Sequence, residues 1–331
     1  MDLPDNLADY RPSGEKCDGK YVLFGIDSDG CVDRGMRYKH GGPFPRAGIE
    51  VFGLQPIAEK WRIAWSFVNE IERRGCPRFE ALAQTVDRVL EMPAVQEAER
   101  LNVVSVPRLS YLRDYLGDVA SKKGYGDNVL WAHIDSLKEG PEKEELTRVA
   151  QWSRTVNSNV DADCPDIEPF SEAIATIRAA YEKKVDMLIV SGTPEKHLRE
   201  AWRKHGLIDK VRGVFGRESG KKNDHLTAAV NASRESDTLY DVVIMFGDAP
   251  GDDKARKKAG ESLGISVRFY PIRVGFEQED WKRFRESFLV DPASYGETEE
   301  TRFVEGFYSN LKRPWISDAD LTQLFPLQQN L

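Results

Sequence analysis

Apolar residues between about positions 34 and 163 repeat at steps of three and four. One such series is Ile57, Trp61, Ala64, Trp65, Val68 and Ile71. This spacing places the apolar side chains on one face of a helix. An alternation of period two, long enough for a sheet, is not found in this stretch. The pattern therefore predicts a helical domain over residues 34–163.

Beyond residue 163 short apolar runs alternate with helical patterns. The runs are Val185–Val190, Val211–Phe215, Asp241–Phe246 and Ile265–Ile272, and one further run, Tyr21–Ile26, precedes the helical stretch. Continuous apolar strands that alternate with helices are typical of a parallel sheet covered on both faces. We therefore expect an α/β core built from residues 1–33 and 164–331, with the helical domain inserted after its first strand.

The composition is that of an ordinary globular protein, with 331 residues, 40% hydrophobic and 31% charged. A net charge of −8 argues against a general nucleic-acid binder, although it leaves small anionic substrates open. The four cysteines show no CxxC pairing, which disfavours a disulfide scaffold or a structural zinc site. Because neither a signal-like segment nor a membrane-length apolar run is found, we expect a cytoplasmic protein with no membrane partner. Its oligomeric state stays open.

Polar residues stand at the ends of three predicted strands. They are Asp27 and Asp29, then Ser191 and Gly192, then Asp248, Asp252 and Asp253. Lys221 and Lys222 precede a predicted helix between the last two strands. Ligands of parallel α/β sheets bind at the carboxyl ends of the strands. We therefore expect these carboxylates, a hydroxyl group and a lysine to share one site.

Those residue types indicate phosphoryl chemistry. Clustered carboxylates without histidine or cysteine suit a hard cation such as Mg²⁺. Phosphoryl transfer depends mainly on positioning and on neutralising charge, and a carboxylate can act as its nucleophile. The segment DSDG alone is equally consistent with a plain Asp–Gly turn. A calcium loop is disfavoured, because glycine stands fourth from Asp27 and Tyr38 occupies the twelfth position.

Four segments in order resemble the motifs of the haloacid dehalogenase (HAD) superfamily: DSDG after an apolar strand, VSGT, a lysine, and GDAPGDD. The resemblance covers roughly residues 20–33 and 165–275. The helical stretch lies where that family inserts a C1 cap domain. The resemblance implies a Rossmann-like, three-layer core with a parallel sheet, an all-helical cap, and a phosphatase activity that requires Mg²⁺.

The resemblance also implies roles for individual residues. Asp27 would attack phosphorus, and Asp29 would serve as the acid and base. Ser191 would donate a hydrogen bond to a phosphoryl oxygen, and a lysine would balance the charge. The metal would be bound by Asp27, the backbone carbonyl of Asp29, and Asp248, with Asp252 holding the metal or its waters.

The motif spacing leaves two choices open. Lys222 is favoured only slightly over Lys221, and Asp253 is an alternative to Asp252. Cys31 stands where the family usually has threonine or valine, and we expect it to pack without taking part in the chemistry.

The substrate is expected to be a small phosphorylated metabolite, whose identity the sequence does not give. Basic residues near turns of the helical stretch are candidates to bind the end of the substrate that is remote from the phosphoryl group. Glycines of the motifs are candidates to bind the phosphoryl group itself. The candidate substrate-binding residues are Gly30, Gly192, Lys221, Lys39, His40 and Arg78.

The leading hypothesis is a Mg²⁺-dependent phosphatase that works through an aspartyl-phosphate intermediate. Dehalogenases and phosphonate hydrolases of the superfamily lack the second aspartate of the first motif, so Asp29 argues against both. A phosphomutase keeps both aspartates and remains an alternative. A non-catalytic phosphate-binding regulatory protein is the alternative from another functional class.

Overall fold

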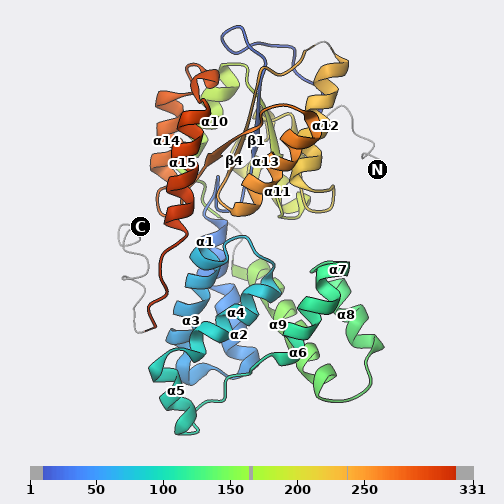
Figure 1. Ribbon diagram of the computed structural model, residues 1–331, viewed down its shortest axis with the longest axis vertical. Coiled ribbons are helices and arrows are strands. Elements are labelled where there is room, and N and C mark those ends of the chain that lie inside the picture. The colour runs from blue at the N-terminus through green and yellow to red at the C-terminus, as the bar shows by residue number, and fades with distance from the viewer. Residues whose placement is uncertain (1–9, 164–166, 237, 318–331) are drawn as a thin grey trace. The chain divides into compact units, whose positions relative to one another are not determined.

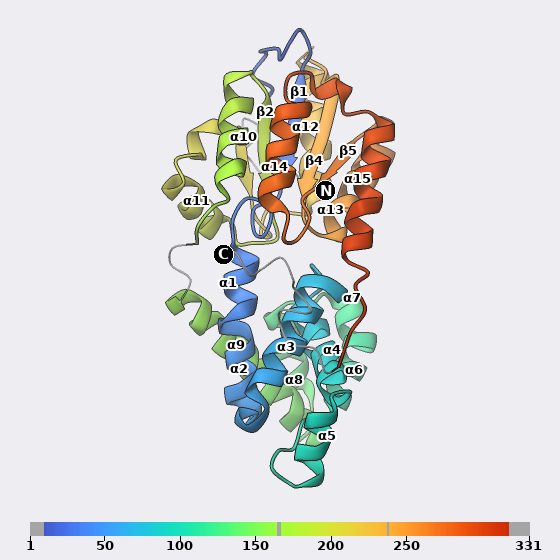
Figure 2. The same cartoon turned by 90° about the vertical axis from the view of Figure 1, so that its left-hand side faces the viewer.

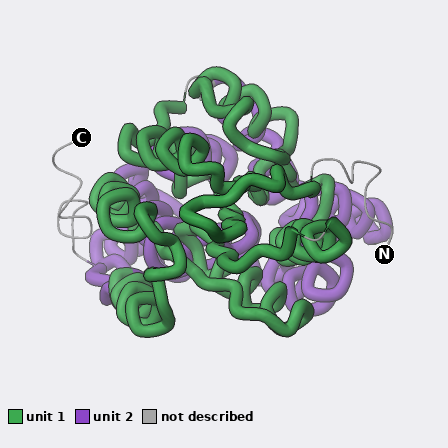
Figure 3. Tube along the Cα trace, turned by 90° about the horizontal axis from the view of Figure 1, so that it is seen from above, with its two compact units in different colours: residues 1–35, 166–310 green, residues 36–165, 311–331 purple. Residues whose placement is uncertain are grey.

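The computed structural model describes residues 10–163, 167–236 and 238–317, and its contacts divide the chain into two units. The sheet unit comprises Met1–Gly35 and Asp166–Asn310, and the helical unit Met36–Pro165 and Leu311–Leu331 (Figure 3). The domain boundaries predicted from the sequence, after residues 33 and 163, lie within two residues of the divisions after Gly35 and Pro165. They differ at the end of the chain, because residues after Asn310 group with the helical unit. There the ring of Trp315 packs 5.0 Å from that of Phe67.

The sheet is parallel and has five strands in the order β3-β2-β1-β4-β5. The strands are β1 (Val22–Ile26), β2 (Asp186–Val190), β3 (Gly213–Phe215), β4 (Val242–Gly247) and β5 (Arg268–Pro271). Every residue of the first four strands is buried. The prediction of a parallel α/β sheet from continuous apolar runs is therefore confirmed.

The central position of β1 sets the geometry of the site. Val22–Ile26 pairs with Val242–Phe246 on one side, and Leu23–Ile26 pairs with Asp186–Ile189 on the other. All three strands run in the same direction, so the residues that follow β1, β2 and β4 lie at one edge of the sheet.

Helices cover both faces of the sheet (Figures 1 and 2). One face packs against α10 (Ser171–Glu182), α11 (Glu195–Lys204) and α14 (Glu277–Ser287), the other against α12 (Lys222–Glu235) and α13 (Pro250–Leu263), while α15 (Glu297–Asn310) contacts β5. Gly25 allows the close approach of α12, because a Cβ atom there would lie 2.6 Å from Leu226 Cδ2. Short 3-10 turns occupy Ile208–Lys210 and Pro292–Ser294.

The helical unit contains only helices and loops in its described residues, as predicted. Its α-helices are α1 (Gly35–Gly41, which begins in the sheet unit), α2 (Pro43–Phe52), α3 (Ala58–Phe67), α4 (Arg78–Leu90), α5 (Pro93–Arg100), α6 (Ser110–Tyr115), α7 (Ser121–Lys123), α8 (Asp127–Ser136) and α9 (Pro141–Asp163). Gln55–Ile57 forms a 3-10 turn, and Val68–Glu72 and Leu116–Ala120 form π-helical turns. Trp61, Trp65 and Trp152 are fully buried in the unit's core. Among the described residues no helix has both the length and the apolar character needed to cross a membrane.

Candidate active site

Asp27 is fixed by the sheet at the point where β1 ends. Its backbone N–H donates to Phe246 O at 3.0 Å, and its Oδ1 accepts the N–H of Ser28 at 2.8 Å. The chain then turns, with Ser28 O accepting backbone N–H groups from the residues that follow. Gly30 has φ +84°, a conformation that favours glycine. The DSDG segment therefore forms a tight turn that also holds a buried carboxylate in place.

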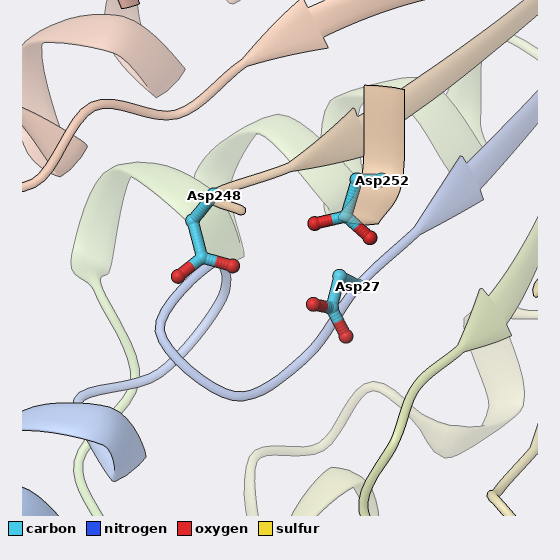
Figure 4. Close-up of side chains that lie close together, drawn as sticks. All are labelled: Asp27, Asp248 and Asp252. Atoms are coloured by element: carbon cyan, nitrogen blue, oxygen red, sulfur yellow. The ribbon is translucent and has the colours of Figure 1, made fainter. Parts of the chain in front are cut away.

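Asp27, Asp248 and Asp252 form a buried carboxylate cluster (Figure 4). Each offers an oxygen within 4.8 Å of the others. Asp248 directly follows β4, and Asp252 lies in the first turn of α13. The parallel order of the strands thus brings together residues from both ends of the sequence, as expected from the strand-end pattern.

Lys222 completes this cluster. Its Nζ lies 2.7 Å from Asp27 Oδ2 and 2.6 Å from Asp252 Oδ1. Burial by itself lowers the pKa of Lys222, but the carboxylates of Asp252 and Asp27 outweigh it and raise the pKa above its ordinary value. Lys222 therefore stays a cation at neutral pH. Lys221, which precedes α12, is exposed, so the structure places Lys222 rather than Lys221 in the cluster.

The two adjacent aspartates of α13 have different surroundings. Asp252 Oδ2 accepts the N–H of Ala249 at 3.1 Å, and burial raises the pKa of Asp252 to about 6 despite the neighbouring Lys222. Asp253 instead accepts hydrogen bonds from Arg256, Lys257 and Tyr308 at 2.8, 2.6 and 2.8 Å. Those partners tie Asp253 to its own helix and to α15. Asp252 is the member of the pair that joins the cluster.

Ser191 follows β2 and is also buried. Its backbone N–H donates to Phe215 O at 3.0 Å, and its Oγ accepts the N–H of Thr193 at 3.3 Å. Gly192 is exposed, and no heavy atom lies within 4 Å of the position that a Cβ would take there. The segment thus presents a hydroxyl group and accessible backbone at the same sheet edge as Asp27.

His40, one of the predicted substrate-binding residues, lies inside an aromatic cluster of the helical unit. Its ring stacks 4.6 Å from Phe44 and 5.9 Å from Trp65, whose Nε1–H donates to His40 Nδ1 at 3.2 Å. Burial, followed by nearby Lys39, Arg74 and Arg78, lowers the pKa of His40 to about 3. The ring is therefore neutral, and these surroundings favour a packing role.

Lys39 and Arg78 belong to the helical unit as well. Lys39 is half-buried in α1. Arg78 begins α4, where its Nη1 donates to Ser153 Oγ at 2.9 Å and to Asn157 Oδ1 at 2.8 Å. These contacts hold the guanidinium of Arg78 between two helices of the unit.

The side-chain hydrogen bonds of Ser28, the residue that follows Asp27, were not predicted from the sequence. Trp202 Nε1–H donates to Ser28 Oγ at 2.9 Å, and Ser28 Oγ lies 3.3 Å from Asp33 Oδ2. Trp202 is 174 positions from Ser28, and no motif links them.

Cys31 is fully buried, and burial, followed by Asp248 and Asp27, raises the pKa of its thiol well above the ordinary value. The thiol is therefore neutral, as expected for a packing residue.

Comparisons with known proteins give matches among solved structures alone. No protein-family model and no curated protein sequence matches the chain. Among solved structures, an archaeal β-phosphoglucomutase from a hyperthermophilic Pyrococcus is 15% identical, with a TM-score of 0.41 over 75% of this chain and 86% of that one. A predicted phosphoglycolate phosphatase from Haemophilus somnus is 14% identical, with a TM-score of 0.43 over 80% and 97%. A haloacid dehalogenase-like hydrolase from Streptococcus pneumoniae is 10% identical, with a TM-score of 0.36 over 79% and 91%.

The fold itself is established by the parallel sheet and by the positions of the sequence motifs within it. DSDG follows the central strand, VSGT and GDAPGDD follow its two neighbours, and Lys222 reaches the same edge from α12. This arrangement agrees with the fold that the resemblance to the haloacid dehalogenase superfamily implies.

Proposed function

We propose that this chain is a Mg²⁺-dependent phosphatase that hydrolyses a small phosphorylated metabolite through an aspartyl-phosphate on Asp27. The observation that carries the proposal is the contact of Asp27 with Lys222 inside the buried carboxylate cluster. A carboxylate that is held by the sheet and contacted by a cation is oriented, as a nucleophile must be. Other carboxylates beside it offer a place for a metal.

The donor set fits Mg²⁺. All three side chains offer oxygen, the ligand atom that Mg²⁺ prefers, and all three are buried. Their three negative charges and the one positive charge of Lys222 leave two negative charges, which a divalent cation would balance. Asp27, Asp248, Asp252 and the backbone carbonyl of Asp29 would hold the ion. When bound, Mg²⁺ would supply neutralisation of the phosphoryl charge.

The residues of the chain would divide the reaction into two steps. In the first, an Asp27 oxygen forms a bond to phosphorus while the bond to the leaving oxygen breaks, and Asp29 protonates that oxygen. In the second, Asp29 takes a proton from water, the water oxygen bonds to phosphorus, and the Asp27–phosphorus bond breaks to release phosphate. Ser191 would donate to a phosphoryl oxygen, and Lys222 would balance the negative charge throughout.

Substrate recognition remains part of the proposal. Gly30, Gly192 and Lys221 of the sheet unit are the candidates for contact with the phosphoryl group. Lys39 and Arg78 stay candidates for recognition of the metabolite, whereas His40 packs against Phe44 and Trp65 and is assigned a packing role.

The test is release of inorganic phosphate from p-nitrophenyl phosphate and from a panel of phosphorylated metabolites. We expect hydrolysis with Mg²⁺, loss of hydrolysis with a chelator, and recovery when Mg²⁺ is added back. Transfer of phosphate between positions of one sugar, without net release, would instead identify a phosphomutase. Binding of metal and phosphate with no turnover on any substrate would contradict an enzymatic role.

Gly247 gives a structural test of the metal site. A Cβ atom at position 247 would lie 2.3 Å from both Cβ and Cγ of Asp252, so the Gly247→Ala variant must displace that carboxylate. We expect weaker Mg²⁺ binding by calorimetry and a lower thermal unfolding midpoint. Gly251→Ala is the matched control. Gly251 lies on α13, the helix that carries Asp252, and a Cβ atom there would have no neighbouring atom within 4 Å. Mg²⁺ affinity equal in the two variants would contradict a role for Asp252 in metal binding.

A further inference from the structure

Three stacked rings connect an early segment of the chain to the sheet unit. Tyr10 is buried, and its ring lies 4.6 Å from that of Phe215 with an interplanar angle of 2°. The ring of Phe215 in turn lies 4.5 Å from that of His225. The Tyr10 hydroxyl and His225 Nδ1 are 2.8 Å apart. The stack therefore joins Tyr10 to β3 and to α12.

Two of these rings belong to residues that are joined to the candidate active site. Phe215 O accepts the backbone N–H of Ser191 at 3.0 Å, so a shift of Phe215 moves Ser191. The backbone N–H of His225 donates to Lys221 O at 3.3 Å in the first turn of α12. Residues three apart on a helix are neighbours on its surface, so His225 lies one turn beyond Lys222. Ser191 and Lys222 are thus both linked to one aromatic stack.

The hydroxyl of Tyr10 is the hydrogen-bond partner that holds the imidazole. His225 is buried, and its Nε2 has no hydrogen-bond partner among the described residues. Burial lowers the pKa of His225, so the ring is neutral and Nδ1 can accept the Tyr10 O–H. The orientation of this ring, and with it the packing of the first turn of α12, depends on Tyr10.

The segment that carries Tyr10 is itself anchored to the sheet unit. Arg212 donates from Nη2 to Arg11 O at 2.9 Å, and Ser13 N–H donates to Asp186 Oδ2 at 2.9 Å. These bonds fix the backbone on either side of residue 12. Tyr10 is thus held on the sheet unit by contacts other than its own ring.

We infer that Tyr10 is a positioning residue, which through Phe215 and His225 sets the places of Ser191 and Lys222 for phosphoryl transfer. This inference rests on the proposed function of those two residues. The chemical sequence motifs do not include Tyr10, Phe215 or His225.

The test is the Tyr10→Phe variant, which keeps the ring stack and removes only the hydroxyl group. We expect kcat on p-nitrophenyl phosphate to fall roughly tenfold, with KM little changed, because small misplacements of groups at the reacting centre lower the rate strongly. His225→Phe keeps the third ring and removes the acceptor, so the same loss is expected. The double variant should lose no more than either single variant, because both break one interaction.

Tyr295→Phe is the matched control. Tyr295 is also buried, and its hydroxyl donates to Phe269 O at 2.7 Å. Phe269 belongs to β5, which lies at the opposite end of the strand order from β3, the strand that carries Phe215. We expect Tyr295→Phe to lower the thermal unfolding midpoint about as much as Tyr10→Phe while leaving kcat unchanged. Equal effects of the two variants on kcat would overturn the inference.

Hydrogen–deuterium exchange separates this inference from the proposed function. In the full chain, Tyr10→Phe should speed exchange in peptides that contain the Ser191 amide and the first turn of α12, whereas Tyr295→Phe should not. If exchange changes in this way but the wild-type protein hydrolyses no phosphate ester, the positioning of the two segments stands and the proposed function fails. Unchanged exchange at both segments overturns the positioning role.

Discussion

The Asp27→Asn variant is expected to fold and to lose phosphatase activity. The amide has nearly the shape of the carboxylate, and Lys222 keeps its contact with Asp252 Oδ1 at 2.6 Å. An amide cannot serve as the nucleophile, so kcat should fall by at least roughly a thousandfold, as is seen when a covalent nucleophile is removed. Steady-state hydrolysis of p-nitrophenyl phosphate with Mg²⁺ measures the loss, and thermal unfolding checks the fold.

Asp253→Asn is the control for this variant. It also neutralises a buried aspartate, but one whose partners are Arg256, Lys257 and Tyr308. Its kcat should stay near the wild-type value, while its thermal stability falls because charge-assisted hydrogen bonds are lost. Full activity of Asp27→Asn would rule out nucleophilic catalysis by Asp27.

Replacing Lys222 by methionine should be the second most damaging change. The substitution keeps most of the aliphatic side chain and removes the cation that contacts Asp27 and Asp252. Two carboxylates would then face each other and an incoming phosphoryl group without compensation. We expect kcat/KM to fall on the order of a hundredfold or more, the scale seen when one electrostatic contact to the transition state is removed.

Lys221→Met provides the comparison at the neighbouring position. Lys221 is exposed and precedes the helix, so its loss should change kcat/KM only slightly, by weakening the binding of the phosphoryl group. Parallel kinetics of the two variants on one substrate measure the difference. A larger loss for Lys221→Met than for Lys222→Met would contradict the placement of the catalytic lysine.

The sequence predicts the sheet well because its strands are buried on both faces. Segments such as Val242–Gly247 are apolar throughout and end directly in charged residues, a combination that is clear without any structure. The chemical nature of the site follows from the same segments, because the parallel arrangement gathers the strand ends at one edge.

The choice between adjacent residues could not be made from the sequence. Lys221 and Lys222 have the same side chain at the start of one helix, and only the direction of each side chain separates them. Asp252 and Asp253 differ in the same way, and the partners of Asp253 come partly from Tyr308, far along the chain. The roles of Tyr10 and Trp202 depend on tertiary contacts that no local pattern records.

The most direct test of the account is to look for phosphate bound covalently to Asp27. In an Asp29→Asn variant, p-nitrophenyl phosphate can still transfer its phosphoryl group, because p-nitrophenolate leaves without protonation, whereas the water that releases phosphate lacks its base. Mass spectrometry of acid-quenched protein, incubated with this substrate and Mg²⁺, should find one added phosphoryl group on the peptide that contains Asp27. A variant that hydrolyses the substrate with no phosphoryl group on Asp27, or that carries the group on another residue, would contradict the account.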